Sequence, residues 1–507
     1  MKARRFLPIA VVLAAGAVVF MWPTTQPLQA PSSASTSTTA PFIDGVYGAA
    51  WEVVPGAPVA GREQIAVADV AGKIFVFGGT TGGYSDENLA PSLFFQDAWV
   101  YDPADGSWAL MPLPHFEMCD LADPVAIAGG FWAPVVLWGR VDRTAEPTCV
   151  PAAALDPTSR TWRPLTGEFF ELLGPDHLVS RQEIPLGDPA LPPASRLVAP
   201  ELGLYFDLVS GATGSLESGG GPPITGPASS AWTGEWHLTV DRGLLFGWEA
   251  HSDSWHFDLG GTPIAADGQD IAATDLGAFL VNQRLEAAVL DAPDSMLWSF
   301  VDSVPLRASA CDPEVLSVGG RPLVRTCVGV AIYEAAGAGW IPFSPPIGID
   351  GTMLATADTL YWFSGQVSRL EFAPDGVIAP RRLPIGLTDI ELPDGYHFAR
   401  AIGLVQTMDA DGNVTAEVHG FEVSTPTGGT CTLVGLYRVN ASPVPDPVKV
   451  ISVERPVLPP LRVLDYSSEG APVRMVIPTA PTDSVEARCG DYAEALELVA
   501  ALQWIEV

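Results

Sequence analysis

Residues 61–79 read GREQIAVADVAGKIFVFGG, and residues 98–108 read AWVYDPADGSW. Runs of β-branched and aromatic residues that end in Gly, Asp or Pro are typical of short strands joined by tight turns. In the second stretch Tyr101 stands seven positions before Trp108, with a DPADG turn between them. This spacing decides the fold because it returns along the chain.

The spacing of seven recurs three times, and once with one extra residue: Leu155/Trp162, Trp248/Trp255, Tyr333/Trp340 and Leu290/Trp298. Successive Trp of this set, from 108 to 340, lie 54, 93, 43 and 42 residues apart, and the long gap holds one degenerate unit at 197–216. Repeats of about 40 to 50 residues that carry several strands each indicate propeller blades, because one sheet cannot bury both of its faces alone.

The first unit resembles a kelch motif: Gly61 and Arg62 at its start, Gly78 and Gly79 after the second strand, then Tyr101, six residues and Trp108. The resemblance is strongest over residues 62–166 and degenerates toward residue 386. It implies an all-β, kelch-like β-propeller of about seven four-stranded blades, near 62–112, 122–166, 195–224, 230–264, 272–305, 310–346 and 351–386. We expect residues 51–54 to add an outer strand to the last blade and close the ring. Six or eight blades, or an elongated array of β-sandwiches, are the alternatives.

The N-terminus has the pattern of an export segment. Basic residues 1–5 precede the apolar run Phe6–Trp22, which suits a signal peptide or a short membrane anchor within residues 1–30. Residues 31–45 form a Ser/Thr-rich linker. The positive-inside rule then places the body outside the cell, secreted or anchored.

The propeller is expected to span residues 46–386, and a small α+β or β-rich domain residues 387–507. Three strands are predicted in this second domain at 401–407, 415–423 and 431–439. The pattern of Tyr492–Leu502 predicts an amphipathic helix, and a short strand follows from Trp504.

The net charge of the chain limits the classes of partner that it is expected to bind. The chain has 59 acidic and 26 basic residues, a net charge of −33, which argues against nucleic acid or an anionic membrane surface as a partner. A monomer is expected.

The six cysteines form neighbouring couples without any C-x-x-C motif, so we expect structural disulfides. Sequential pairing is preferred among the fifteen possibilities: Cys119–Cys149, Cys311–Cys327 and Cys431–Cys489.

Candidate metal and catalytic motifs are weak. Residues 409–413 (DADGN) resemble the start of a calcium loop but lack its distal Glu, so a hairpin turn is preferred. His237, His251 and His256 fall in one predicted blade, where strand alternation would scatter them; they are read as surface or turn residues. A copper oxidase on a kelch propeller would also need two converging Tyr. We therefore predict no metal and no cofactor.

Sialidase-like chemistry is also disfavoured, because the S-x-D-x-G-x-x-W boxes of sialidases are missing and nothing groups the available arginines: Arg62, Arg140, Arg143, Arg163, Arg181, Arg196 and Arg242. Arg62 stands out, since kelch proteins place it near the inner edge of a blade. A structural salt bridge is the preferred role there.

Two long loops, 80–97 and 165–195, favour a non-catalytic extracellular binding scaffold for a protein or glycan, since propellers carry function in their loops. The predicted contact residues are Tyr84, Phe94, Phe95, Phe169, Phe170 and Arg62, with a small satellite core as the alternative role of the aromatic ones. The competing hypothesis is a carbohydrate-active enzyme of the sugar oxidase or mutarotase type on the axial face. It would require carboxylates and arginines to converge at the axial mouth.

Overall fold

A computed structural model of the chain describes residues 51–504 with internal gaps, the longest of which are 82–92, 141–149, 167–179, 184–194, 372–379 and 439–446. By its contacts the chain divides into residues 1–45 and residues 46–507. The second unit is described below by itself.

Within the described residues, six antiparallel sheets hold four strands each, and a further sheet holds the same four-strand path plus the short β4 (Leu93–Phe94). The sheet with β4 contains β2 (Glu63–Val70), β3 (Lys73–Thr81), β5 (Ala98–Asp102) and β6 (Ser107–Leu110). The next four sheets contain β7 (Asp120–Ile127), β8 (Val135–Arg140), β9 (Ala152–Asp156) and β10 (Thr161–Leu165); β11 (Ser180–Glu183), β12 (Ser195–Ala199), β13 (Leu204–Asp207) and β14 (Thr213–Ser215); β15 (Ser229–Trp232), β16 (Trp236–Asp241), β17 (Leu244–Glu249) and β18 (Ser254–His256); and β19 (Asp270–Thr274), β20 (Gly277–Val281), β21 (Ala287–Ala292) and β22 (Leu297–Val301). The last two contain β23 (Glu314–Val318), β24 (Arg321–Thr326), β25 (Gly329–Glu334) and β26 (Gly339–Phe343); and β27 (Thr352–Ala355), β28 (Thr359–Phe363), β29 (Val367–Glu371) and β1 (Glu52–Val53).

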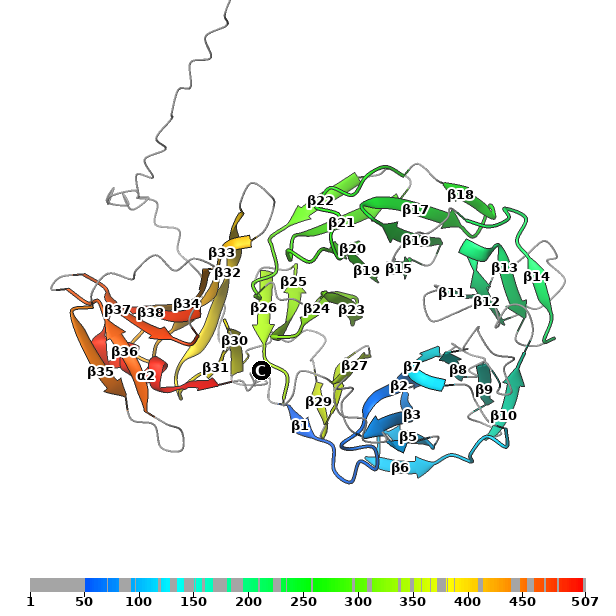
Figure 1. The fold of residues 1–507 in the computed structure, drawn as a ribbon, viewed down its shortest axis with the longest axis horizontal. Helices are drawn as coiled ribbons and strands as arrows, with labels where there is room; N and C mark the ends of the chain where they lie inside the picture. Colours follow the sequence, from blue (N-terminus) through cyan, green and yellow to red (C-terminus); the bar gives the residue numbers. More distant parts are fainter. Residues whose placement is uncertain are drawn as a thin grey trace, which may run out of the picture. The chain divides into compact units, whose positions relative to one another are not determined.

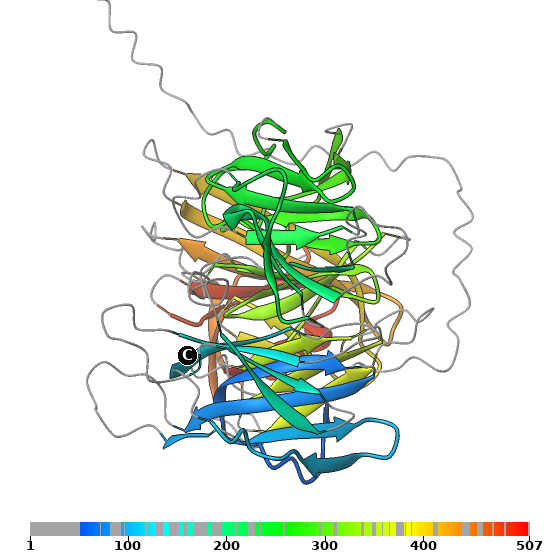
Figure 2. The same cartoon turned by 90° about the vertical axis from the view of Figure 1, so that its right-hand side faces the viewer.

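The sheets follow one another around a ring, as the colour sequence in Figure 1 and the edge-on view in Figure 2 show. β27 is the inner strand of the blade that contains β1, and in the other blades the inner strand is the first one along the chain: β2 contacts β7 and β27, and β19 contacts β15 and β23. The ring closes where β1 pairs with β29, Glu52 opposite Arg369. The predicted β-propeller and its closure by the first strand are therefore confirmed.

The five repeat tryptophans occupy equivalent places, as predicted. Each is the second residue of the outermost strand of its blade, and each lies opposite the apolar residue that precedes it in the repeat: Trp108, Trp162, Trp255, Trp298 and Trp340. The extra residue before Trp298 is accommodated by a register shift between Leu290 and Ala292, which is how a bulge inserts one residue into a strand.

Indole N–H groups tie neighbouring blades together. Trp162 Nε1 donates to the carbonyl of Pro112, which follows the outer strand of the preceding blade, at 2.6 Å. Trp340 Nε1 donates to Asp302, after β22, at 2.6 Å, and Trp51 Nε1 donates to Ser344, after β26, at 2.8 Å. A buried indole N–H needs an acceptor, and here the acceptor belongs to the preceding blade of the ring.

Two expected blade boundaries are wrong. The blade predicted at 195–224 begins with β11, inside the stretch expected to be a loop at 165–195. Its sequence SRQE has no apolar residue, so only its pairing with β12 makes it a strand. The blade predicted at 351–386 ends at Glu371, because β30 (Arg382–Ile385) pairs instead with β31 (Thr388–Glu391), and β31 pairs with β39 (Leu502–Trp504).

Residues beyond β31 build a seven-stranded antiparallel sheet in the order β32-β33-β34-β38-β37-β36-β35. Its strands are β32 (His397–Met408), β33 (Val414–Ser424), β34 (Thr430–Arg438), β35 (Lys449–Val453), β36 (Leu461–Asp465), β37 (Val473–Pro478) and β38 (Asp483–Cys489). The first three are the predicted strands, and the last four were not predicted.

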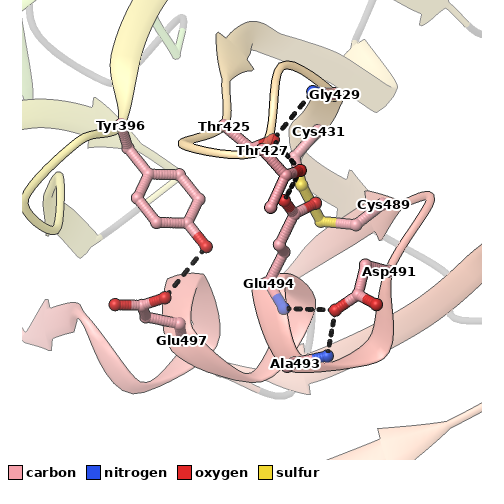
Figure 3. Close-up of a disulfide and its surroundings, with 10 residues drawn as sticks. All are labelled: Tyr396, Thr425, Thr427, Gly429, Cys431, Cys489, Asp491, Ala493, Glu494 and Glu497. Carbon is pink, nitrogen blue, oxygen red and sulfur yellow. Dashed lines mark hydrogen bonds between the residues drawn. A yellow bond between two sulfur atoms is a disulfide. The ribbon is translucent and has the colours of Figure 1, made fainter.

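Helix α2 (Tyr492–Ala500) follows β38, close to where the sequence predicts it. It begins at Asp491, whose carboxylate accepts hydrogen bonds from the backbone N–H groups of Ala493 and Glu494, and its buried residues include Ala495 and Leu498. Such a cap satisfies helix N–H groups that have no partner within the helix. Figure 3 shows the start of the helix beside a disulfide.

That disulfide joins Cys431 to Cys489 at facing positions of β34 and β38, since Thr432 lies opposite Arg488. This predicted pair is confirmed. Cys327 is also disulfide-bonded, but its expected partner Cys311, like Cys119 and Cys149, lies outside the described residues.

Over the described part of the chain, no helix is long and apolar enough to cross a membrane. The apolar run Phe6–Trp22, predicted as a signal or anchor, lies outside that part.

Candidate binding face of the propeller

The inner strands of the blades all start at the same end of the ring. Antiparallel order also places the end of the second strand and the start of the third strand of each blade there. Asp270, the first residue of β19, links three blades at this end: it accepts a hydrogen bond from the Ser229 hydroxyl at the start of β15, and its Oδ2 accepts from Val315 N of β23 at 2.6 Å. This end is called the loop face; β3 and β10 end there, and β5 begins there.

The first blade carries a buried ion pair on the loop face. Arg62, 7% exposed, donates to both carboxylate oxygens of Asp97 at 2.5 and 2.9 Å. It also donates to the carbonyl of Gly78 at 3.0 Å, and its guanidinium lies 3.8 Å from the ring centroid of Phe95. Trp99 Nε1 donates to Asp97 at 2.6 Å. A two-pronged Arg–carboxylate pair of this kind fixes direction as well as distance, so the preferred structural role of Arg62 is confirmed.

The electrostatics of Asp97 agree with this geometry. Burial alone would raise the pKa of its carboxyl, but hydrogen bonds from Arg62 and Trp99 together with the Arg62 charge hold the pKa below its usual range. Asp97 is therefore a permanent anion and a fixed anchor at neutral pH.

Two further carboxylates on this face are also engaged. Burial raises the pKa of Asp270, although Ser229 and two backbone N–H groups donate to it. Glu314, the first residue of β23, accepts from Arg325 at 3.0 Å. Arg325 also donates to the carbonyl of Gly351 in front of β27, and its guanidinium lies 4.8 Å from the ring centroid of Trp362. These contacts join successive blades and hold the face rigid.

The predicted contact residues are brought together only in part. Phe95 stacks on Arg62, and Phe94 lies in β4, where it pairs with Thr80. Tyr84, Phe169 and Phe170 lie outside the described residues. Of these residues, Phe95 therefore lies next to the ion pair.

The three histidines of one blade are scattered, as predicted. His237 lies in β16, fully buried, and contacts a carboxylate oxygen of Glu201 at 2.7 Å; its expected surface or turn position is wrong, because β16 is buried along its whole length. His251 is exposed, and exposed His256 packs on the Trp236 ring. Among the described residues, no group of three or more His, Cys, Asp or Glu is placed to hold a metal ion.

The remaining candidate residues lie outside the described residues or on separate elements. Residues 409–413 lie outside the described residues, between the paired strands β32 and β33. Arg143 also lies outside them, and the other arginines considered for a sialidase-like site are on separate strands or turns. Arg140 is on β8, Arg163 on β10, Arg181 on β11 and Arg196 on β12.

Sequence reasoning missed Asp97, Asp270, Glu314 and Arg325. Asp270 and Glu314 are each the first residue of an inner strand, so an alignment of the repeats by their inner strands would have found them. Asp97 has a weaker signal in the sequence, because the long loop 80–97 separates it from Gly78 and Gly79.

Comparison with known proteins bears directly on this region. The kelch motif family matches residues 62–112, which begin at Arg62 and contain the Arg62–Asp97 pair. The chain is a β-propeller whose first blade carries a kelch motif. N-acetylneuraminate epimerase of Pasteurella multocida is 31% identical to this chain over 80 residues, which are 16% of this chain and 20% of that enzyme. The match therefore spans about a fifth of the length of this curated relative.

Two solved structures are similar at low identity. One is PorZ, an essential bacterial surface component of the type-IX secretion system of Porphyromonas gingivalis, at 9% identity and a TM-score of 0.36 over 86% of this chain and 58% of that one. The other is YjhT, at 13% identity and a TM-score of 0.28 over 57% of this chain and 85% of that one.

Proposed function

We propose that this kelch-type propeller is a non-catalytic binding scaffold for a protein or a glycan, and that the loop face is its binding surface. The Arg62–Asp97 ion pair carries the proposal. It clamps the base of the long segment 82–97 to the inner edge of the first blade, with Phe95 stacked against it. A rigid base reduces the ordering cost when a loop binds a ligand.

The charged groups on this face support binding rather than chemistry. Arg62, Asp97, Glu314 and Arg325 are each held in an ion pair, and Asp270 accepts three hydrogen bonds. General acid–base catalysis needs a group that is free to exchange a proton with substrate. These residues instead hold loops and blades in place.

A loop exchange tests the proposal. Residues 83–92 would be replaced by a Gly/Ser segment of equal length, and the matched control would replace residues 185–193, which join β11 to β12 at the opposite end of the ring. A panel of neutral and acidic glycans and of peptides would be screened by thermal shift, because a ligand of the folded state raises the melting temperature. The proposal requires a ligand whose shift is lost in the 83–92 variant and kept in the control. Shifts that survive both exchanges would refute it.

A second candidate, a carbohydrate-active enzyme of the mutarotase type, is favoured by the similarity to N-acetylneuraminate epimerase over 80 residues. Incubation of the chain with N-acetylneuraminate and with neutral sugars, followed by NMR of anomer exchange, separates the two candidates. Catalysed exchange by the unmodified chain would replace the scaffold proposal.

We also propose that the body works outside the cell as a monomer, secreted or anchored by its N-terminal segment. The basic and apolar residues 1–22 and the Cys431–Cys489 disulfide support this, because disulfides persist in oxidising compartments. Fractionation of producing cells, with N-terminal sequencing and light scattering of the product, tests the location, the processing and the monomer. A chain that stays unprocessed inside the cell with free thiols would refute it.

A further inference from the structure

The seven-stranded sheet has two unlike faces. Val485, Ala487 and Cys489 of β38 belong to the buried core that includes Ala495 and Leu498 of α2. Side chains alternate along a strand, so residues between these positions lie on the opposite face. That face is called the outer sheet face.

Strand register places one row of polar side chains across the outer sheet face. Arg400 lies opposite Glu422, Glu422 opposite Thr432, Thr432 opposite Arg488, and Arg488 opposite Arg474. With strands about 4.8 Å apart, this row of five residues extends about 19 Å. The row continues to Tyr466, whose backbone N–H donates to Arg474 O at 2.9 Å.

The charge of this face is opposite to that of the chain. Strand alternation places five arginines and two glutamates on it: Arg400, Arg438, Arg462, Arg474, Arg488, Glu422 and Glu486. Five positive charges less two negative charges give +3, in a protein whose net charge is −33. All the basic residues of this set are arginines.

The central arginines are held in place by a buried acid. Glu486 is 1% exposed, while the side chains of Arg474 and Arg488 remain 46% and 54% exposed. Arg474 donates to both oxygens of Glu486 at 2.7 and 2.9 Å, and Arg488 donates to one of them. Arg400 pairs in the same two-pronged way with Glu422, at 2.7 and 2.6 Å. Guanidinium groups fixed in this way still carry exposed donors and lose little entropy on binding.

The row next to the arginines contains Val434 and Val476 on either side of Glu486. All three are buried, so the exposed apolar residues of this face lie farther out. Toward the two margins of the sheet, Val405 is 63% and Val450 is 50% exposed. A patch with arginine and aliphatic groups and without lysine has the composition of a protein interface, where Arg is enriched and Lys is depleted.

We infer that the outer sheet face docks an acidic protein surface, one that presents Asp and Glu side chains to the arginines. Charge complementarity selects this partner. A second copy docked by two-fold symmetry would set the arginine row against itself, which is repulsive. Nucleic acid would be repelled by the net charge of −33. The inference is independent of the loop face.

The test uses a charge reversal away from the buried acid. Arg438 and Arg462 are exposed and lie opposite Ala416 and Ser452, so Arg438→Glu with Arg462→Glu leaves the Glu486 pairs intact. The matched control, Arg163→Glu with Arg284→Glu, makes the same charge change on propeller blades. Thermal unfolding of both variants would verify that they fold.

The probe is a fluorescent peptide of alternating Glu and Val residues, titrated with the full chain at low salt and followed by anisotropy. We expect saturable binding that weakens with salt, falls about tenfold or more in the Arg438/Arg462 variant, and is unchanged in the control and in the 83–92 loop variant. Polygalacturonate and anionic lipid vesicles serve as comparison arms. The inference is overturned if the peptide does not bind, if the charge reversal has no effect, or if polygalacturonate or vesicles bind in its place.

Discussion

Removing the Arg62 guanidinium should destabilise the first blade. A double-mutant cycle with Asp97 should then measure the coupling energy between the two side chains. The substitution Arg62→Met keeps the aliphatic stem and deletes two hydrogen bonds to Asp97, one to Gly78 and the contact with Phe95. Breaking a buried ion pair by removing one partner costs about 3–5 kcal/mol. The Asp97 side chain is 22% exposed and keeps its bond from Trp99, so we expect the lower end, about 3 kcal/mol.

The complementary change Asp97→Asn keeps the shape but leaves the guanidinium without its counter-charge, and should cost about 2 kcal/mol. In the double variant no lone charge remains. We therefore expect it to be little worse than Arg62→Met alone, with a coupling of about 1–2 kcal/mol between the two sites.

Urea unfolding of the four proteins, read by tryptophan fluorescence, gives the cycle. Hydrogen exchange of residues 63–81 locates the loss in the first blade, which matters because a ring of repeats need not unfold in one step. A cost below 1 kcal/mol for Arg62→Met, or additive effects of the two substitutions, would refute the view that this pair anchors the segment.

Three further predictions concern other parts of the chain. Trp340→Phe should cost about 1–2 kcal/mol in urea unfolding, because it deletes the hydrogen bond to Asp302 O, whereas Trp298→Phe should cost less, since Trp298 Nε1 has no partner among the described residues; equal costs would contradict the role of the N–H. Replacing Cys431 and Cys489 together by Ala should cost about 4 kcal/mol, as the bond spans 58 residues of chain, and an unchanged melting curve would contradict this. Burial and the nearby Arg307 lower the pKa of His419 to about 4 from 6.5. Between these two pH values the unfolded chain carries a proton on this histidine and the folded chain does not, so the free energy of unfolding falls as the pH falls. His419→Gln should remove up to about 3 kcal/mol of this dependence; identical pH profiles of the two proteins would refute it.

The sequence predicts the ring because the signal is local. An apolar residue, a tight turn and a tryptophan lie within eight or nine residues, and that unit becomes the last two strands of a blade. The same reasoning fails for β11, whose four polar residues are a strand through pairing with β12. It also fails for β35 to β38, which are short and lack a repeated marker.

Only part of the candidate site could be predicted from the sequence. Arg62 and Phe95 were singled out because the kelch motif and the long loop mark them. Asp97 is 35 residues from Arg62, and Asp270 meets Val315 across 45 residues. These partners meet only after the blades have packed, so a pattern read along the chain does not contain them.

Closure of the ring has a consequence for how the chain is made. The fourth strand of the last blade, β1, precedes its partner β29 by more than 300 residues, as the Arg369–Glu52 bond at a separation of 317 shows. Synthesis runs from the N-terminus, so β1 leaves the ribosome early and must stay unpaired until residue 371 has followed it. A nascent chain halted anywhere in the blades is an open arc whose end blades each leave one sheet face uncovered, and its β1 segment is still unpaired, so both can associate with other chains. Completion of the propeller is therefore a late, all-or-none event in the life of the polypeptide, and chaperones that hold the first blades would act on the segment that ultimately locks the last one.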